Sequence, residues 1–371
     1  MTVIQRLLVG SFLLLPSSSF SFSYCVLPWV RSMRGPHAVV RPSAPPRQPI
    51  QPQRFSSSPY GAGLDQDALM ESDWLIAVDA QDTVVMTDHP TDPDAPPQPP
   101  RLTKRQGHAF SSDTPRAVLH RAFSFFFFDA SGNMLLTQRA ASKITFPNVW
   151  TNACCSHPLH GMSPSEVDHW PLSPPPLSSS EEKPPQTPSL PSLSGIKRAV
   201  RRKVPHELGP SASALLLPST TTPESAMVFV QRFHYWAADC LTHGRDRCPW
   251  GEHELDYVFF VQGSLHRPTL QPNPEEVSDY RYVSMDELRQ LLNDTSLRWS
   301  PWFRGIMERG GWDWWADLTG TLQGKYTTTD IVYFDPPPAH VAEYNLPSHH
   351  ATDTGVWKAT SATLIRTASA S

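Results

Sequence analysis

The stretch HRAFSFFFFDASGNMLLTQR, His120 to Arg139, says most about the fold of this chain. Its first half is an apolar run rich in phenylalanine, and a second apolar run starts at Met134. Between them lies Asp129-Ala-Ser-Gly-Asn, whose residue types are typical of a tight turn. The stretch therefore predicts two neighbouring antiparallel strands joined as a hairpin.

Further strands and helices are predicted on both sides of this hairpin. Trp74–Asp79 and Leu255–Val261 have the apolar character of strands. Three helices are expected, over Ile196–Leu208, from Ser284 to about Leu292, and over Pro301–Met307. Gly209 suits the C-cap of the first helix, and Ser284-Met-Asp-Glu287 matches a capping box at the start of the second. This alternation of strands and helices indicates an α/β protein.

Large parts of the chain are not expected to fold, since 40 of its 371 residues are proline. Residues 163–194 contain nine prolines and nine serines, and such a segment cannot bury enough apolar surface to offset chain entropy. We expect a disordered insertion there and another near 87–100. A disordered extension is expected over 1–64 and a C-terminal tail outside the core over 326–371. One domain over 70–325 remains.

The net charge of the chain and the charges of its first 64 residues indicate which partners and which cellular compartment to expect. The net charge of -4 shows no basic excess, which disfavours nucleic-acid binding through a broad basic face. Residues 1–64 hold six arginines and no acidic residue. They begin with an apolar run that is too short to predict a stable membrane span. An apolar segment followed by an Arg/Ser-rich one is typical of a removable address. We expect import into a plastid in preference to a mitochondrion, with an extension that carries no address as the alternative.

The stretch WTNACCSHP, Trp150 to Pro158, contains candidate chemistry because Cys155 stands two residues before His157. A free thiol has a pKa near 8.5, so at neutral pH it is mostly protonated and can donate a proton. Cysteine can also act as a nucleophile or a metal ligand, or simply as a small buried apolar residue. These readings stay open at this point.

A second cluster, GEHELDY at Gly251–Tyr257, offers two carboxylates. In a strand, Glu252 and Glu254 point to the same face, where two like charges are costly unless a cation joins them. His108, His120 and His157 could complete a site for Mn, Zn or Fe, whereas Mg prefers oxygen ligands. Ordinary acids on a solvated edge strand are the alternative.

Basic residues form the third group. Lys104, Arg139 and Lys143 border the hairpin, and the run Arg198–Lys203 leads to Glu207 on the predicted helix. Cations beside a carboxylate could hold a phosphorylated ligand through a metal ion. A solvated basic helix face is the alternative.

These residues occur in strings that resemble one family, the type I isopentenyl-diphosphate delta-isomerases of the Nudix superfamily, over about 104–316. The strings keep the family's order, and they are LHRAFS at 119–124, SKITFPNVWTNACCSHPL at 142–159, RRKVPHELG at 201–209, WGEHELDY at 250–257, PNPEE at 272–276 and SPWF at 300–303.

The resemblance implies a Nudix-like α/β/α sandwich with a mixed β-sheet. It implies an enzyme of isoprenoid biosynthesis that converts isopentenyl diphosphate to dimethylallyl diphosphate, by protonation and deprotonation through a carbocation-like intermediate. It also implies a substrate-associated Mg²⁺ and a second divalent metal, Mn²⁺, Zn²⁺ or Mg²⁺. The expected partner is this small substrate alone, and the expected state is a monomer.

The resemblance also implies a role for each candidate residue. Cys155 and Glu254 are the expected catalytic pair, assisted by Tyr235, with the indole of Trp302 facing the cation. The diphosphate-binding cations would be Lys104, Arg139, Lys143 and Lys203. The metal ligands would be His108, His120, His157, Glu252 and Glu254, with Glu207 on the substrate-associated Mg²⁺.

Other functions remain to be weighed against this one. A Nudix hydrolase of a nucleoside diphosphate needs clustered glutamates on the helix, but only Glu207 is present and His206 stands beside it. A binding protein without activity would be expected to lack Cys155 or Glu254. A thiol hydrolase would need a base in contact with the sulfur. Pro205 predicts a kink or an early end of the helix, because proline loses a helical hydrogen bond.

Overall fold

The structure is a computed structural model, and it describes residues 60–61, 63–87, 97–110, 117–168, 193–216, 227–243, 249–263, 267 and 269–334. Most of the extension expected over 1–64 and most of the tail expected over 326–371 lie outside these residues. The central parts of both expected insertions, 88–96 and 169–192, also lie outside them.

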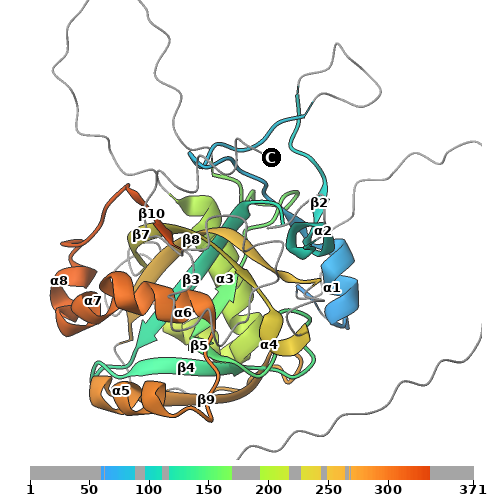
Figure 1. Cartoon of the computed structure of the whole chain (residues 1–371). Coiled ribbons are helices and arrows are strands. Elements are labelled where there is room, and N and C mark those ends of the chain that lie inside the picture. Colours follow the sequence, from blue (N-terminus) through green and yellow to red (C-terminus); the bar gives the residue numbers. More distant parts are fainter. Residues whose placement is uncertain are drawn as a thin grey trace, which may run out of the picture. The chain divides into compact units, whose positions relative to one another are not determined.

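An eight-stranded mixed sheet forms the centre of the described chain (Figure 1). Its strands are β3 (His120–Phe128), β4 (Met134–Arg139), β5 (Trp150–Asn152), β6 (Cys154–Ser156), β7 (Val228–Ala238), β8 (Gly251–Gln262), β9 (Val277–Val283) and β10 (Ile331–Phe334). The order is β10-β7-β8-β3-β4-β5, with β6 paired to β3 and β9 paired to β4. β3 runs parallel to β8 and β10 parallel to β7, while the other pairs are antiparallel.

Strand β3 is buried along its whole length because both of its faces are covered. Phe123, Phe125 and Phe127 belong to one apolar cluster, whereas Phe126 and Phe128 belong to another. Side chains alternate between the two faces of a strand, so a strand with covered faces has apolar residues at successive positions. The phenylalanine run is thus explained by a position inside the sandwich.

The helices divide between the two faces of the sheet. One cluster joins the sheet to α3 (Ser194–Leu208) and to the 3₁₀ segment η1 (Pro210–Leu216). The other joins it to α6 (Pro301–Ile306) and α7 (Trp312–Ala316), which lie toward the viewer in Figure 1. The remaining segments nearby are α5 (Met285–Asn293), the π turn η3 (Met307–Gly311) and α8 (Leu318–Leu322). The predicted α/β/α sandwich with a mixed sheet is confirmed.

The predicted hairpin is present, but its strands separate after the turn. Asp129 accepts backbone hydrogen bonds from Ser131 and Asn133 at 2.9 Å each, and Gly132 takes a positive φ of 79°. Beyond the pair formed by Phe128 and Met134, β4 pairs with β5 and β9, while β3 pairs with β6 and β8. The hairpin therefore opens into two separate parts of the sheet.

Helix α3 forms as predicted and runs through Pro205 to Leu208. The early end that Pro205 led us to expect does not occur. Gly209 caps the helix with φ 90°, and a Cβ atom there would lie 2.4 Å from the carbonyl oxygen of Gln271. Glycine is thus required both by the left-handed backbone and by the close approach.

The segment before the sheet contains α1 (Gln66–Ser72), β1 (Trp74–Leu75), β2 (Leu102–Thr103) and α2 (Lys104–His108). The strand expected over Trp74–Asp79 is shorter than predicted, since only isolated bridges at Ala77 and Val78 follow β1. The buried carboxylate of Asp82 accepts hydrogen bonds from Arg121, Arg232 and Tyr257. These three residues lie on β3, β7 and β8, so the segment is fastened to the sheet by a buried ion network.

Two expected boundaries need correction. β10 lies beyond the domain end expected at 325, and its Phe334 is fully buried in the apolar cluster that includes residues of α6 and α7. Within the insertion expected over 163–194, Glu166 is buried and accepts hydrogen bonds from Arg202 and the backbone of Leu159. Asp168 accepts from the backbone of Gly195 at 2.9 Å and so caps α3. Both ends of that insertion therefore belong to the folded part.

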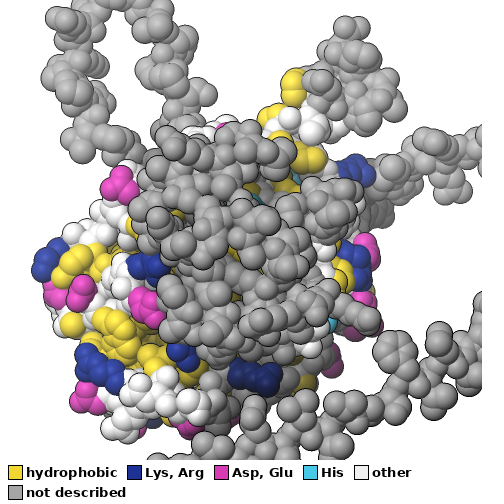
Figure 2. Space-filling model, in the orientation of Figure 1, with side chains coloured by type: hydrophobic (Ala, Val, Ile, Leu, Met, Phe, Trp, Pro, Cys, Tyr) yellow, Lys and Arg dark blue, Asp and Glu magenta, His cyan; other side chains and the backbone are white. Residues whose placement is uncertain are grey.

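The described surface carries charged side chains of both signs. On the face shown in Figure 2, basic and acidic side chains alternate over the part formed by described residues. None of the helices among the described residues is long and apolar enough to span a membrane. The remaining described helix, α4 (Cys240–His243), is a single turn.

Candidate active site

Five buried side chains come together where α2, β3, β6 and β8 meet. Each offers one ligand atom, and these atoms all lie within 4.8 Å of one another. They are His108 at the end of α2, His120 at the start of β3, His157 just after β6, and Glu252 and Glu254 on β8. The strand register places His120 directly beside Glu254. Residues separated by up to 146 positions are thus brought into one group by parallel pairing of β3 with β8.

The two deepest histidines are held by backbone carbonyls. His108 Nδ1 lies 2.7 Å from the carbonyl oxygen of Lys104, and His120 Nδ1 lies 2.7 Å from that of Val118. Carbonyls accept, so each Nδ1 carries the proton and each Nε2 keeps its lone pair. His108 Nε2 faces Glu252 Oε2 at 2.8 Å and His120 Nε2 faces Glu254 Oε1 at 3.9 Å, but with the proton on Nδ1 neither Nε2 atom donates a hydrogen bond to these buried carboxyl oxygens. Buried polar atoms are costly without a partner, so this group fits a divalent metal.

The protonation states of the histidines and of Glu252 are those that metal ligands require. Burial lowers the pKa of His120 to about 3 and lowers the pKa of His157 well below its usual range. Both imidazoles are therefore neutral, as metal ligands must be. Burial acts to raise the pKa of Glu252, but the neighbouring His108 outweighs it and brings that pKa to about 2. Glu252 is thus a carboxylate at neutral pH.

The thiol of Cys155 lies among polar partners near this group. It donates to Asn152 Oδ1 at 3.0 Å and accepts from the indole N–H of Trp302 at 3.1 Å. The hydroxyls of Thr151 and Ser124 approach the sulfur to 3.7 Å and 3.8 Å. Burial raises the pKa of Cys155 to about 12, so the resting group is a thiol that carries its proton.

Glu254 has contacts that suit a proton-transfer group. Tyr235 on β7 donates a short hydrogen bond to Glu254 Oε2, and His157 Nε2 lies 2.8 Å from Oε1. Burial raises the pKa of Glu254 well above its usual range, and the like charges of Glu252 and Asp256 add to this effect. A divalent cation at the same group would act in the opposite sense.

Aromatic residues line the site beside Cys155. Trp302 on α6 contacts Phe146 edge-on with ring centroids 5.5 Å apart, and Tyr235 lies at 6.4 Å from the same indole. Phe146 is fully buried and takes a positive φ of 47°, with its N–H donating to the buried carboxylate of Asp239 at 2.8 Å. The loop between β4 and β5 is thereby held against the aromatic wall.

One cavity collects nearly all the residues expected from the sequence. It has a volume of about 20 Å³, which is room for about one water molecule, so a larger ligand enters only if side chains move. Its lining includes the expected catalytic residues Cys155, Glu254, Tyr235 and Trp302, the expected cations Lys104, Arg139, Lys143 and Lys203, and the expected ligands His108, His157, Glu207 and Glu252. His120 lies behind this surface, within the metal-ligand group.

Three residues of the site were not predicted. Thr145 and Ser156 line the cavity, and the available signal is that they stand two residues after Lys143 and one residue after Cys155 in the chain. Glu276 holds two of the expected cations, with Oε2 at 2.6 Å from Lys143 Nζ and Oε1 at 3.2 Å from Lys203 Nζ. Its signal in the sequence is its place in the string PNPEE, for which the resemblance implies no role.

The arrangement offers a thiol and a carboxyl group at one cavity, with an aromatic wall beside them and four cations among the lining residues. Such a site suits proton transfer on an apolar group that is anchored by an anion. It lacks clustered glutamates on α3, where Glu207 is ion-paired with Lys203 at 3.2 Å.

Comparisons with known proteins give a consistent result. The isopentenyl-diphosphate delta-isomerase of Schizosaccharomyces pombe is 36% identical over 216 residues, covering 58% of this chain and 78% of that protein. The chloroplastic isopentenyl-diphosphate Delta-isomerase 1 of Cannabis sativa is 34% identical over 290 residues, covering 75% of this chain and 82% of its own. No family model matches the chain.

Among solved structures, a Nudix hydrolase from M. smegmatis matches 60% of this chain and 98% of its own, with 14% identity and a TM-score of 0.26. A score this low supports no conclusion. The sequence relatives are sufficient, because their identity exceeds one third and extends over most of their length. This chain therefore belongs to the isopentenyl-diphosphate delta-isomerase family.

Proposed function

We propose that this protein interconverts isopentenyl diphosphate and dimethylallyl diphosphate, with Cys155 and Glu254 as the proton-transfer pair. The observation that carries the assignment of residues is that both groups line one small cavity beside the indole of Trp302. Family membership supports the reaction, since the relatives carry the name of this isomerase.

The substrate is anchored by its diphosphate. Lys104, Arg139, Lys143 and Lys203 gather at the cavity from α2, β4, the following loop and α3. Charge-assisted hydrogen bonds to a phosphate are among the strongest in proteins. Binding energy spent on this remote group orients the five-carbon unit for reaction.

The chemistry is a net transfer of the double bond without change in composition. The terminal carbon of the alkene gains a proton, the tertiary carbocation-like species forms at the other alkene carbon, and the CH₂ carbon on the far side of that centre loses a proton. We assign these two transfers to the Cys155 thiol and the Glu254 carboxyl group, one giving and the other taking. One turnover leaves the donor without its proton and the acceptor with an added one, and exchange with solvent returns the pair to its starting state. The reverse reaction uses the same two groups in exchanged roles.

The cationic species requires a dry site with an electron-rich face. Trp302 presents an indole that is fixed through its N–H to Cys155 Sγ at 3.1 Å. A cation over an aromatic face is stabilised electrostatically, and exclusion of water prevents its capture. Tyr235 keeps the carboxyl group of Glu254 in place by its hydrogen bond.

Two divalent ions belong to this proposal. His108, His120, His157, Glu252 and Glu254 would hold one of them, Mn²⁺, Zn²⁺ or Mg²⁺. Glu207 would hold a Mg²⁺ together with the diphosphate. When bound, these ions supply positive charge that offsets the carboxylates and the phosphate oxygens.

We also propose import into a plastid and a monomeric state. The acid-free, Arg/Ser-rich residues 1–64 support an address, and the Cannabis sativa relative is named chloroplastic. A fusion of residues 1–64 to a fluorescent protein tests the address, and light scattering tests the monomer. Fluorescence confined to mitochondria or the cytosol would contradict the first proposal.

The reaction is tested with isopentenyl diphosphate and Mg²⁺ in deuterated water, followed by NMR. The expected result is a second allylic methyl resonance and deuterium at the exchanged carbons. Incubation with a nucleoside diphosphate is the parallel assay for the hydrolase alternative. Phosphate release there, with no isomerisation of the first substrate, would overturn the proposal.

A further inference from the structure

We infer that Glu276 is a positioning residue for diphosphate binding, which holds Lys143 and Lys203 on opposite walls of the anion site. This inference deepens the proposed function and rests on it. Glu276 belongs to the turn before β9 and contacts neither Cys155 nor Glu254 in any described hydrogen bond or ion pair. Its influence on turnover therefore passes through the two lysines.

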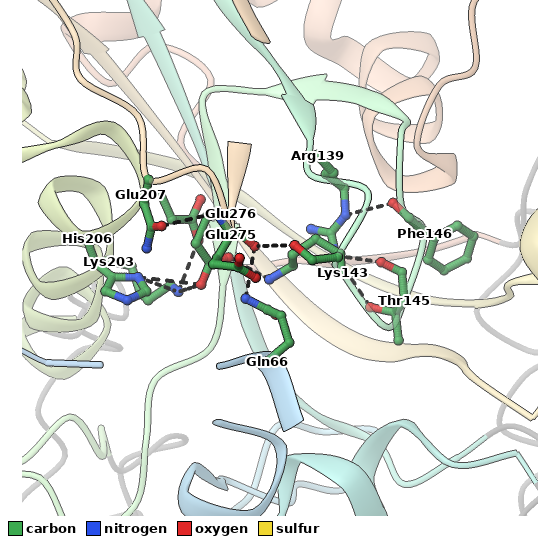
Figure 3. Close-up of polar contacts among 12 residues, drawn as sticks. Gln66, Arg139, Lys143, Thr145, Phe146, Lys203, His206, Glu207, Glu275 and Glu276 are labelled. Atoms are coloured by element: carbon green, nitrogen blue, oxygen red, sulfur yellow. Dashed lines mark hydrogen bonds and ion pairs between the residues drawn. The ribbon is translucent and has the colours of Figure 1, made fainter. Parts of the chain in front are cut away.

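The contacts form a bridge across the site (Figure 3). Glu276 Oε2 lies 2.6 Å from Lys143 Nζ, and Oε1 lies 3.2 Å from Lys203 Nζ. Only 3% of Glu276 and 3% of Lys203 are exposed, so these are buried ion pairs and not surface contacts. One carboxylate thus fixes the distance between a cation on the β4–β5 loop and a cation on α3.

The backbone of the same turn ties together the elements that carry these lysines. The carbonyl of Glu276 accepts from the N–H of Ala140, near Lys143. The N–H of Asn273 donates to the carbonyl of Glu207 at 2.9 Å, at the end of α3. The carbonyl of Glu275 accepts from the side chains of Gln66 and Ser142, which joins α1 to the loop. The turn is therefore a fixed base for the side chain of Glu276.

Charge explains why the cations need this partner. Lys143 faces like charges from three elements, namely Lys104 on α2, Arg139 on β4 and Lys203 on α3, and Glu276 opposes them. Burial lowers the pKa of Lys143 to about 8, even with Glu276 acting to raise it. Without Glu276 the ammonium group would be buried among cations, and it would lose its proton at a lower pH.

The carboxylate does not cancel the attraction for a diphosphate. Four cations line the cavity, Lys104, Arg139, Lys143 and Lys203, and four carboxyl groups lie near them, Glu207 and Glu276 beside the lysines and Glu252 and Glu254 in the metal-ligand group. Divalent ions held by Glu207, Glu252 and Glu254 would offset those three groups, which leaves the cations available to the phosphate oxygens. The gain from two charged, correctly placed lysines exceeds the repulsion from one carboxylate that is already paired with both.

The test compares Glu276→Gln, Glu276→Asp and the control Glu275→Gln in the full chain. Glu275 is exposed in the same turn and contributes its backbone carbonyl, which the substitution leaves in place. Three quantities are measured for each protein: KM and kcat with isopentenyl diphosphate, the Kd for inorganic pyrophosphate with Mg²⁺ by calorimetry, and the melting temperature.

We expect Glu276→Gln to raise KM and the pyrophosphate Kd about tenfold at pH 8, the loss expected for one weakened charged contact. The increase is smaller at pH 6, where a larger fraction of Lys143 is protonated in the variant than at pH 8. The value of kcat changes less than threefold, Glu276→Asp lies between the two, and Glu275→Gln behaves as the wild type. If Glu276→Gln does not fold, the inference is tested with Glu276→Asp alone. A measurable rise in its pyrophosphate Kd supports the inference, and an unchanged Kd contradicts it.

An unchanged or lower KM and Kd for Glu276→Gln would overturn the inference, since the carboxylate would then be neutral or compete with the substrate. A loss of kcat at constant KM and constant pyrophosphate Kd would also overturn the inference. Failure of the wild type to convert isopentenyl diphosphate is a different result. It would refute the proposed function, while the pyrophosphate Kd would still test whether Glu276 organises an anion site.

Discussion

Two adjacent cysteines on β6 have different surroundings because they point to opposite faces of the strand. Cys154 is buried in the cluster that packs on α3, whereas Cys155 points to the opposite face and contacts Trp302 and Asn152. Burial raises the pKa of both thiols, so neither is reactive by ionisation alone. The difference in their chemistry lies in what surrounds the sulfur.

The first prediction concerns this pair. Cys155→Ala and Glu254→Gln should each lower kcat about a thousandfold, the effect of removing a positioned proton-transfer group. Cys154→Ala is the matched control, and it should keep kcat within a few-fold. Product formation is followed by NMR, and circular dichroism checks the fold. Substantial turnover by Cys155→Ala would remove this residue from the mechanism.

The second prediction concerns the indole N–H. Trp302→Phe keeps an aromatic ring but loses the hydrogen bond to Cys155 Sγ. A net loss of about 1 kcal/mol should lower kcat roughly fivefold, with KM nearly constant. Trp312→Phe, a half-buried tryptophan outside the cavity lining, is the control and should leave kcat unchanged. Equal kcat for both variants would show that the N–H has no part in turnover.

At the scale of elements, α5 illustrates local sequence information. Ser284 accepts from the N–H of Glu287, and the Glu287 side chain accepts from the N–H of Ser284. We predict that Ser284→Ala lowers the free energy of unfolding by about 1 kcal/mol and leaves kcat/KM unchanged. Denaturant unfolding measures the first and the isomerase assay the second. Ser284→Asp, which keeps a capping oxygen, should retain most of the stability, and equal losses for both variants would contradict this explanation.

Elements that depend on neighbouring residues in the chain could be predicted, whereas elements that depend on distant strands could not. The capping box of α5 and the turn Asp129–Asn133 depend on neighbours in the chain, so their residue types identify them. β10 is four residues long and exists because it pairs with β7, nearly a hundred residues earlier. No periodicity marks so short a strand, and we placed it in the tail. The opening of the hairpin likewise depends on β8 and β9, which sequence pattern alone does not place.

Prediction of the site from the sequence was limited in a similar way. The residue types and their order identified the candidate ligands and cations through the resemblance, but their gathering depends on the parallel pairing of β3 with β8. Glu276 was missed because an acidic residue in a Pro-rich turn is ordinary by itself. Its meaning comes from Lys143 and Lys203, which approach it only in the folded chain.

A prediction at the scale of the molecule concerns the insertion. Replacing 169–192 by a short Gly/Ser linker should leave kcat/KM within about twofold, because Asp168 already contacts Gly195 at 2.9 Å and the gap is small. Deleting 163–194 should instead reduce soluble protein, because it removes the buried ion pair of Glu166 with Arg202 and the cap of α3. Yield and kcat/KM are compared for both deletions. Equal behaviour of the two would contradict these roles.

A last prediction concerns the metal ligands, which come from four elements. An ion bound at a concentration of about 100 Kd should add roughly 2.7 kcal/mol to folding stability. Treatment with a chelator should therefore lower the melting temperature by several degrees, and Mn²⁺ or Zn²⁺ should restore it. His157→Ala should lose most of this response. A melting temperature indifferent to chelation in the wild type would argue against a resident ion.

The two-sided burial of β3 has a consequence for biosynthesis. Its phenylalanines are covered on one edge by β8, which begins more than a hundred residues later. At ordinary rates of translation, that strand leaves the ribosome on the order of ten seconds before its neighbour. During this interval the run Phe123–Phe128, which has high β-propensity and no charged side chain, is open to self-association. We therefore expect nascent chains to depend on a holding chaperone until β8 is made.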